Sequence, residues 1–184
     1  MTSLRGHVLV ATKKLDETDF ARTVILLLNH DRSGASGVIL NRPVPETVSS
    51  LWQRMCHESC ERNSRVNFGG PVSAPLVAVH DMKPLGEMQI TADHLFVAAQ
   101  RDHLTQLIHQ EDHPLRLFVG RAAWDRGKLE FELNSGAWHV IPANREIVFD
   151  DDEHLWPTLT RKIKDAILCS ILDIQHVPVN IAMN

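Results

Sequence analysis

The sequence lacks long apolar runs and an excess of positive charge, and it has few cysteines. No uninterrupted apolar run is longer than that of residues 24–28, which is far too short to cross a bilayer. Residues 1–15 also lack the apolar core of a signal peptide. Three cysteines are an odd number, which fits a reducing compartment better than a disulfide framework. We therefore expect a cytoplasmic protein that has no membrane association.

The charge balance disfavours nucleic acid as a partner. The chain has 19 Lys and Arg residues against 23 Asp and Glu, a net charge of -4 and a pI near 6.2. Nucleic-acid-binding domains usually have a pI above about 9. One acidic run, residues 150–153, precedes a helical pattern, where negative charge favours the exposed amides of a helix N-terminus. An acidic docking surface is the alternative interpretation of this run.

Complete catalytic and cofactor motifs are absent as well. A nucleophile elbow needs Gly-x-Ser-x-Gly between a strand and a helix, but Gly34-Ala35-Ser36-Gly37 is one residue short and leads into a strand pattern. The chain contains no Gly-Lys-Ser/Thr tripeptide and no H-E-x-x-H motif. We therefore expect Ser36 to be a hairpin residue, and we expect no cofactor.

The chain does contain enough apolar residues for one folded core. It has 184 residues, of which 43% are hydrophobic, and this length is a little above the commonest single-domain size. No block is low in complexity and no repeat is present. We expect one domain that covers residues 1–184.

Apolar patterning predicts more strands than helices. Most links between the strands are too short for parallel crossovers, which need a dozen or more residues. This predicts an α+β fold with mainly antiparallel sheets and about three helices. The expected strands are residues 7–11, 23–29, 38–41, 66–68, 76–80, 88–90, 94–98, 115–120, 128–133 and 138–141. The expected helices are residues 47–63, 101–110 and one from residue 152 that buries Leu155, Leu159, Ile163, Ala166 and Ile167.

Residues 23–42 are expected to form an antiparallel hairpin. Two strand-length apolar runs flank residues 31–37, where an aspartate begins a turn and two glycines are free to take positive φ. This hairpin is the simplest explanation of the glycine-rich stretch.

Histidines and cysteines offer two incomplete metal sites. His30 and His80 each end a predicted strand and precede an aspartate, so they could meet at one sheet edge to bind a metal or transfer a proton. Structural hydrogen bonding is favoured, because no spacing fixes a third ligand. Cys56 and Cys60 lie four residues apart on a predicted helix, but free thiols are favoured there too. We assign no metal.

The turn Gly69-Gly70-Pro71 offers a possible anion site. Glycine permits close backbone approach and can leave successive amides pointing outward. Arg22 or Arg42 could complement a carboxylate or phosphate bound there. A tight turn between strands is the alternative. We expect this turn and Arg42 to border one concave, partly polar pocket.

Several segments, taken in order, carry a resemblance to a known family. They are LVAT (9–12), FARTVILLLNH (20–30), GASGVILNRP (34–43), FGGPV (68–72), VAVH (77–80), RDHL (101–104), GRAAWDRGKLEFEL (120–133) and AWHVIPA (137–143). Through them the chain resembles the YqgE/AlgH family of bacterial proteins. The resemblance implies an α+β fold and a bacterial cytosolic protein. Members of the family are sometimes described as transcriptional regulators, and no catalytic residues are agreed for them. The positions that match its recurring pattern, and on which we place a candidate site, are Arg22, His30, Asn41, Arg42, Gly69, Gly70, His80 and Glu130.

Three functions are weighed on this basis. The first is a non-enzymatic binding or regulatory protein with a pocket for a small anion or a surface for a protein partner. The second is a metal-dependent hydrolase that uses His30 and His80. The third, a DNA-binding regulator, is disfavoured by the acidic pI and the lack of a basic recognition helix.

Overall fold

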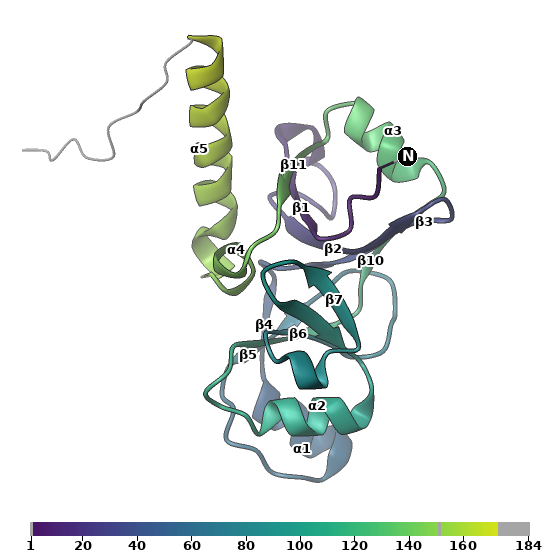
Figure 1. Cartoon of the computed structure of the whole chain (residues 1–184), viewed down its shortest axis with the longest axis vertical. Coiled ribbons are helices and arrows are strands. Elements are labelled where there is room, and N and C mark those ends of the chain that lie inside the picture. The colour runs from purple at the N-terminus through teal and green to yellow at the C-terminus, as the bar shows by residue number, and fades with distance from the viewer. Residues whose placement is uncertain (1, 151, 173–184) are drawn as a thin grey trace, which may run out of the picture.

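The protein is built on two β-sheets. The computed structural model describes residues 2–150 and 152–172, and Figure 1 shows the five-stranded sheet above the six-stranded sheet in an elongated molecule. The five-stranded sheet has the order β10-β3-β2-β1-β11, with every neighbouring pair antiparallel. Its strands are β1 (His7–Ala11), β2 (Val24–Asp31), β3 (Gly34–Ile39), β10 (Ala122–Asp125) and β11 (Trp138–Pro142).

The six-stranded sheet has the order β4-β5-β9-β6-β8-β7. One pair, β5 with β9, is parallel, and the other neighbouring pairs are antiparallel. The sheet consists of β4 (Pro43–Thr47), β5 (Arg65–Phe68), β6 (Val77–His80), β7 (Met88–Thr91), β8 (Leu95–Ala98) and β9 (Leu115–Val119).

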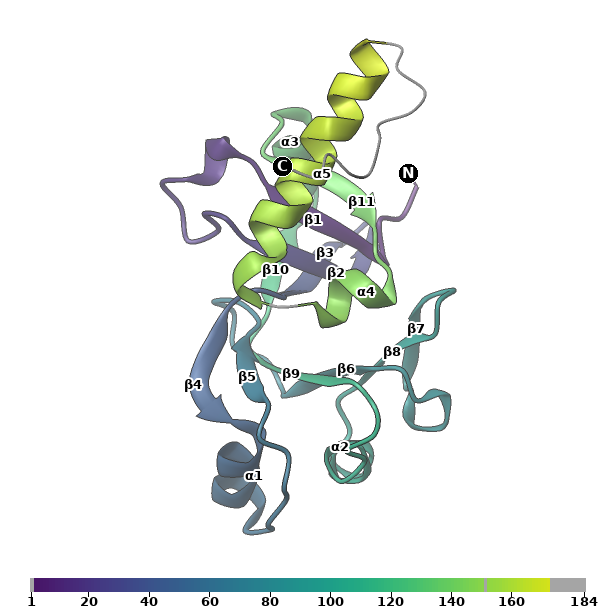
Figure 2. The same cartoon turned by 90° about the vertical axis from the view of Figure 1, so that its left-hand side faces the viewer.

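Five α-helices occur in the described part of the chain, two more than expected. They are α1 (Val48–Cys56), α2 (Arg101–Ile108), α3 (Lys128–Asn134), α4 (Arg145–Phe149) and α5 (Asp152–Ile171), with short 3₁₀ turns at Lys13–Leu15 and Lys83–Leu85. α1 and α2 lie at the far end of the six-stranded sheet (Figure 1), and α5 crosses the face of the five-stranded sheet (Figure 2). The predicted α+β class and mainly antiparallel pairing are confirmed, but the number of helices is wrong.

Buried apolar side chains form three clusters that explain this layering. The first fills the space between the two sheets, α4 and α5, and includes Leu26, Phe118, Val148 and Leu155. The second lies on the other face of the five-stranded sheet, under α3. The third packs α1 and α2 against the six-stranded sheet. Each sheet is therefore covered on both faces.

The predicted hairpin is confirmed, with a shorter loop than expected. β2 and β3 pair antiparallel, and only residues 32 and 33 separate them. Residues 34–37 belong to β3 because they pair on both sides, with β2 and with β10. The two glycines thus stand where strands approach closely.

The predicted strand at residues 128–133 is wrong, because this segment forms α3. Leu129 and Leu133 pack in the second apolar cluster, which contains Trp124 and Trp138, whereas Phe131 between them is 74% exposed. A spacing of four residues satisfies a helix and a strand equally, so the alternation was misleading. Gly127, with φ 78°, supplies the left-handed residue that turns the chain into the helix.

The end of α1 and the burial of α5 also differ from expectation. α1 ends at Cys56, since His57 adopts a left-handed conformation with φ 58°, so the helix does not reach Asn63. α5 begins at Asp152 and buries Leu155 and Leu159 as predicted. Ala166 and Ile167 are exposed, which corrects the prediction that they are buried. The C-terminal part of α5 extends past the sheet that its first turns cover (Figure 2).

No helix in residues 2–150 and 152–172 combines the length and the apolarity needed for a membrane span.

Candidate functional site: a pocket with two arginines

The hairpin brings Arg22 and Arg42 to its open end. Ile25 pairs with Ile39 near the open end of the hairpin. Arg22 precedes β2 and Arg42 follows β3, so antiparallel pairing brings both residues to the same end of the hairpin. The two segments FARTV and LNRP therefore meet at one place, although they are about 20 residues apart in sequence.

Asn41 extends the hairpin with its side chain. It is buried, its Oδ1 accepts a hydrogen bond from the Val24 amide at 2.8 Å, and its Nδ2 donates to the Arg22 carbonyl at 2.8 Å. The carboxamide thus replaces a backbone peptide group in the hydrogen bonding between the strand ends. These two bonds fix the backbone on which Arg22 stands.

Arg22 has an uncommon backbone conformation. Its φ is 53°, in the left-handed region that non-glycine residues rarely occupy. Its guanidinium carbon lies 5.8 Å from the ring centroid of Trp156 in α5, within the range of a cation–π contact. The indole is itself held, because Trp156 Nε1 donates to the Ala11 carbonyl at 2.9 Å. Residues held in such conformations tend to cluster at functional sites.

Arg42 is half-buried and anchored from both ends. Its Nη2 donates to the Ala21 carbonyl at 2.5 Å, and its own carbonyl accepts from the Phe68 amide at 2.7 Å. Since an arginine has five N–H donors, this single side-chain bond leaves others for a ligand.

Arg22, Asn41 and Arg42 line one cavity of about 430 Å³. Its other lining residues are Pro43, Glu153, Trp156 and Pro157. In the part of the chain that the structure describes, neither arginine forms an ion pair with a carboxylate. This volume lies within the range of small-molecule sites.

Gly69 and Gly70 are not among the residues that line this cavity. The Gly69 amide donates to the Val119 carbonyl at 2.8 Å, and the Gly69 carbonyl accepts from Ile39 at 3.0 Å. A Cβ on Gly69 would lie 2.3 Å from the Gly120 carbonyl oxygen, and one on Gly70 would lie 2.3 Å from the Ala122 amide nitrogen. These glycines allow two backbones to cross where the sheets meet.

His30 uses both ring nitrogens. Its Nδ1 accepts from the Leu4 amide at 2.8 Å, so the ring proton is on Nε2, which donates to Glu130 Oε1 at 3.0 Å. A hydrogen bond from its own main-chain amide, together with that from His30, lowers the pKa of Glu130. With the ring buried and both nitrogens engaged, His30 is held as a structural group.

His80 lies in the other sheet and is completely buried. Its Nδ1 accepts from the Met82 amide at 3.2 Å, and its Nε2 has no hydrogen-bond partner among the described residues. Burial lowers the pKa of His80 to about 4, so the ring is neutral at pH 7. His30 and His80 share no carboxylate, and the described residues contain no group of three or more His, Cys, Asp or Glu side chains that could hold a metal.

The aromatic residues of the resemblance surround a partly buried carboxylate. Glu132 Oε2 accepts from Trp124 Nε1 at 2.9 Å and from Trp138 Nε1 at 2.8 Å. Phe20 stacks on one indole and meets the edge of the other. This arrangement explains these residues by packing and hydrogen bonding.

Sequence reasoning missed the residues that α5 contributes to the cavity. Glu153, Trp156 and Pro157 lie more than 100 residues after the hairpin, and no local pattern links the two segments. The apolar face of α5 indicated that the helix packs on a core, but not which strands it covers. A cation–π contact leaves no spacing signal in a sequence.

Comparisons with known proteins agree along nearly the whole chain. A family model described as AlgH-like matches residues 8–167. A UPF0301 protein of Shewanella loihica is 35% identical over 171 residues, covering 89% of this chain and 92% of the relative. One of Shewanella putrefaciens is 34% identical over 174 residues, with the same coverage.

Two solved structures have the same fold. The solution structure of the AlgH protein from Pseudomonas aeruginosa is 23% identical, with a TM-score of 0.73 and 97% of each chain covered. The crystal structure of protein DIP2367 from Corynebacterium diphtheriae is 24% identical, with a TM-score of 0.69, covering 88% of this chain and 87% of that chain.

Proposed function

This chain belongs to the AlgH-like family, and within that family we propose that it is a non-enzymatic protein that binds a small anion between Arg22 and Arg42. The observation that carries this proposal is that two arginines without a carboxylate partner among the described residues line one cavity at the open end of the hairpin. Two positive charges that share one cavity repel each other. A bound anion turns that repulsion into two attractions.

The pocket is suited to a carboxylate or phosphate group. Arginine forms bidentate, charge-assisted hydrogen bonds with both groups, and its planar fork loses little freedom when it does so. Asn41 and the Ala21 carbonyl already hold the two arginine segments in place. Pro43, Pro157 and Trp156 add apolar surface for the rest of a small metabolite.

Binding is favoured over catalysis by the placement of the histidines. Both nitrogens of His30 are engaged, and His80 is buried in a different sheet. The proposed location is the cytoplasm, because Cys56, Cys60 and Cys169 are free thiols, as in reducing compartments.

Isothermal titration of the full chain against a panel of phosphorylated and polycarboxylate metabolites tests this function. Arg42→Ala should weaken the binding of any ligand found by about 1.5 to 3 kcal/mol, the scale of a charged hydrogen bond, or roughly 10- to 150-fold in Kd. Arg22→Ala should weaken binding by a similar factor, and it leaves the hydrogen bond from Arg42 to the Ala21 carbonyl in place.

Arg32 is the matched control, because it is an exposed arginine at the tip of the same hairpin and does not line the cavity. Arg32→Ala should bind as the parent does. If no anion binds, or if Arg32→Ala weakens binding as much as the pocket variants do, the proposed function is wrong.

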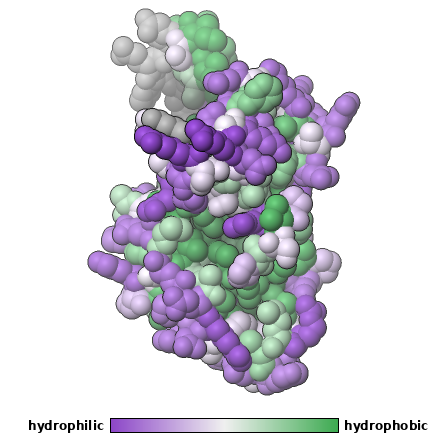
Figure 3. Space-filling model, turned by 90° about the vertical axis from the view of Figure 1, so that its right-hand side faces the viewer, coloured by the Kyte–Doolittle hydropathy of each residue, from purple (hydrophilic) through white to green (hydrophobic). Residues whose placement is uncertain are grey.

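A protein partner is the second candidate, favoured by a different observation. Phe68, Val72 and Val119 are 41%, 38% and 44% exposed, and Phe68 pairs with Val119 across β5 and β9. Apolar side chains gather in the middle of the face seen in Figure 3. Contiguous exposed apolar residues often mark interaction sites.

A photo-crosslinking residue tests this candidate when it replaces Val119 in cells. It should capture a discrete partner. The control places the same residue at Phe131, which is exposed but does not belong to the patch of Phe68, Val72 and Val119, and should not capture that partner.

A further inference from the structure

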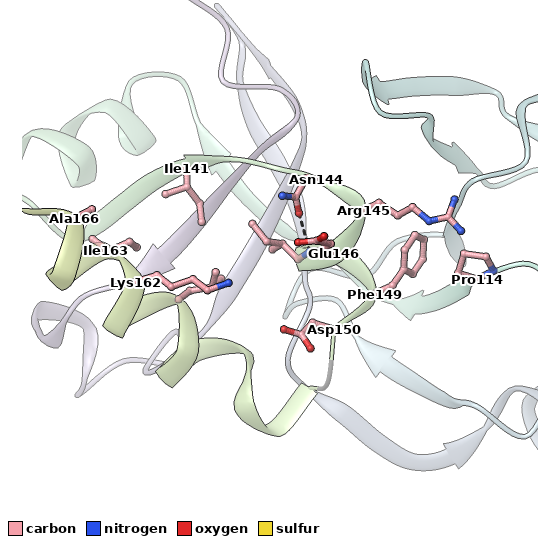
Figure 4. A pocket seen from close by; sticks show the side chains of 12 residues that line it. Pro114, Ile141, Asn144, Arg145, Glu146, Phe149, Asp150, Lys162, Ile163 and Ala166 are labelled. Atoms are coloured by element: carbon pink, nitrogen blue, oxygen red, sulfur yellow. Dashed lines mark hydrogen bonds between the residues drawn. The ribbon is translucent and has the colours of Figure 1, made fainter. Parts of the chain in front are cut away.

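A second cavity lies on another side of α5. It has a volume of about 920 Å³ and is bounded by α4, α5 and β11 (Figure 4). None of its lining residues lines the arginine pocket. It is therefore a separate candidate site.

Much of the wall of this cavity is apolar. Ile141 comes from β11, Ile147 from α4, and Leu159, Ile163 and Ala166 from α5. Ile141, Ile147 and Ile163 pack on the central core cluster yet remain partly exposed. The apolar surface also continues along α5, where Ile167 and Ile171 follow Ile163 at four-residue intervals and are 46% and 73% exposed.

The charges around the cavity leave one cation for a ligand. Arg145 forms an ion pair with Asp81, and Asp150 has a partner of its own. Glu146 lies in the first turn of α4, where a negative charge is favoured. Lys162 has no carboxylate partner within the described residues, and Figure 4 shows its side chain reaching from α5 across the cavity.

We propose that this cavity binds a free, medium-chain carboxylate. The carboxylate would pair with Lys162, and the alkyl chain would lie along Ile141, Ile163 and Ala166 toward Ile167. A monomeric ligand is favoured over a membrane surface because the apolar wall is recessed between three elements.

Chain length is the most informative variable in the test. Isothermal titration with hexanoate, octanoate and decanoate, each below its critical micelle concentration, should show Kd falling up to about fourfold per added methylene, the value of one buried CH₂. Acetate should not bind, and 1-hexanol should bind more weakly than hexanoate. Affinity that is independent of chain length would overturn the proposal.

Two substitutions on α5 test the location. Ala166→Trp should obstruct the path of the alkyl chain and abolish decanoate binding, and it should fold because Ala166 is exposed. Asp165→Trp adds the same side chain next to it, outside the cavity, and should bind normally. Equal binding by these two variants would contradict the proposed site.

Lys162→Gln should raise the Kd for decanoate about two- to fivefold, the value of an exposed ion pair, whereas Lys164→Gln should change it less.

Arg22→Gly should leave decanoate binding intact, so failure of the arginine pocket and failure of this site are separable. Sedimentation with anionic vesicles without binding of soluble decanoate would contradict the free-ligand proposal and favour a lipid surface.

Discussion

Arg22 adopts a backbone conformation that costs a non-glycine residue about 1 to 2 kcal/mol. The bond from Asn41 and the contact with Trp156 hold it there. Glycine would meet the same backbone requirement without strain. The presence of an arginine at this position is therefore explained by its guanidinium group.

Arg22→Gly should separate stability from binding. Relief of strain offsets the lost cation–π contact and the entropy of glycine, so the free energy of unfolding should stay within about 1 kcal/mol of the parent value. Affinity for an anion in the pocket should fall as in Arg22→Ala. Urea denaturation and calorimetry measure the two quantities. A large loss of stability with unchanged binding would assign Arg22 a purely structural role.

His80 should make stability depend on pH. Burial lowers its pKa to about 4 against the attraction of Asp81 and Glu87, whereas in the unfolded chain it titrates near 6.5. As the pH falls, the unfolded state therefore binds the proton first. The free energy of unfolding is unaffected by His80 above pH 6.5, and it falls by up to about 3 kcal/mol toward pH 4. His80→Asn should flatten this part of the profile in urea denaturation between pH 4 and 8. An unchanged slope would show that other groups cause it.

Single residues of the pocket were partly predictable from the sequence. The resemblance selected Arg22, Asn41 and Arg42, and the hairpin pattern was enough to bring them together. The same reasoning assigned Gly69 and Gly70 to an anion site, but the Gly69 amide and the missing side chains of both glycines serve a backbone crossing. Close approach and ligand binding both require glycine, so composition alone does not distinguish them.

Among the secondary-structure elements, α3 and α5 differ most from what their local sequence patterns predict. The four-residue spacing of Leu129 and Leu133 fits both a helix and a strand. The left-handed conformation of Gly127 turns the chain into the helix. α5 carries apolar residues along its whole length, but the sheet ends before the helix does. Periodicity identifies the apolar face of a helix, whereas its extent of burial depends on neighbours distant in sequence.

Gly127→Ala should destabilise the protein by about 1 to 2 kcal/mol through backbone strain alone. A Cβ at this position would meet no atom within 4 Å, so no steric overlap contributes. Gly127→Asn should cost less, because asparagine tolerates the left-handed region. Thermal and urea unfolding measure both variants. Equal stability of the alanine variant and the parent would contradict this account of how α3 begins.

The first turn of α5 should tune the arginine pocket. Glu153 lines the pocket with Arg22 and Arg42, so its charge opposes a bound anion. Glu153→Gln should strengthen anion binding by up to about 1 kcal/mol, or roughly fivefold. Glu146→Gln on α4, outside this pocket, is the control. Weaker binding in Glu153→Gln would mean that the carboxylate supports the site.

For the whole molecule, the sequence was sufficient for the fold class but not for the division into two sheets. Short links correctly predicted antiparallel neighbours among consecutive strands. β5 and β9 are parallel because residues 69–114, which include β6, β7, β8 and α2, separate them and provide a long crossover. The cavities lie where α4 and α5 meet the sheets, so their positions depend on tertiary packing that no single segment encodes.

The most direct test of the arginine pocket is a titration of the full chain with inorganic phosphate at constant ionic strength, followed by the Nε–Hε resonances of its arginines. The pocket predicts that the Arg22 and Arg42 resonances shift together along one saturating curve while that of Arg32 does not move. Uniform small shifts of all exposed arginines, or unmoved Arg22 and Arg42 resonances up to saturating phosphate, would contradict anion binding between them.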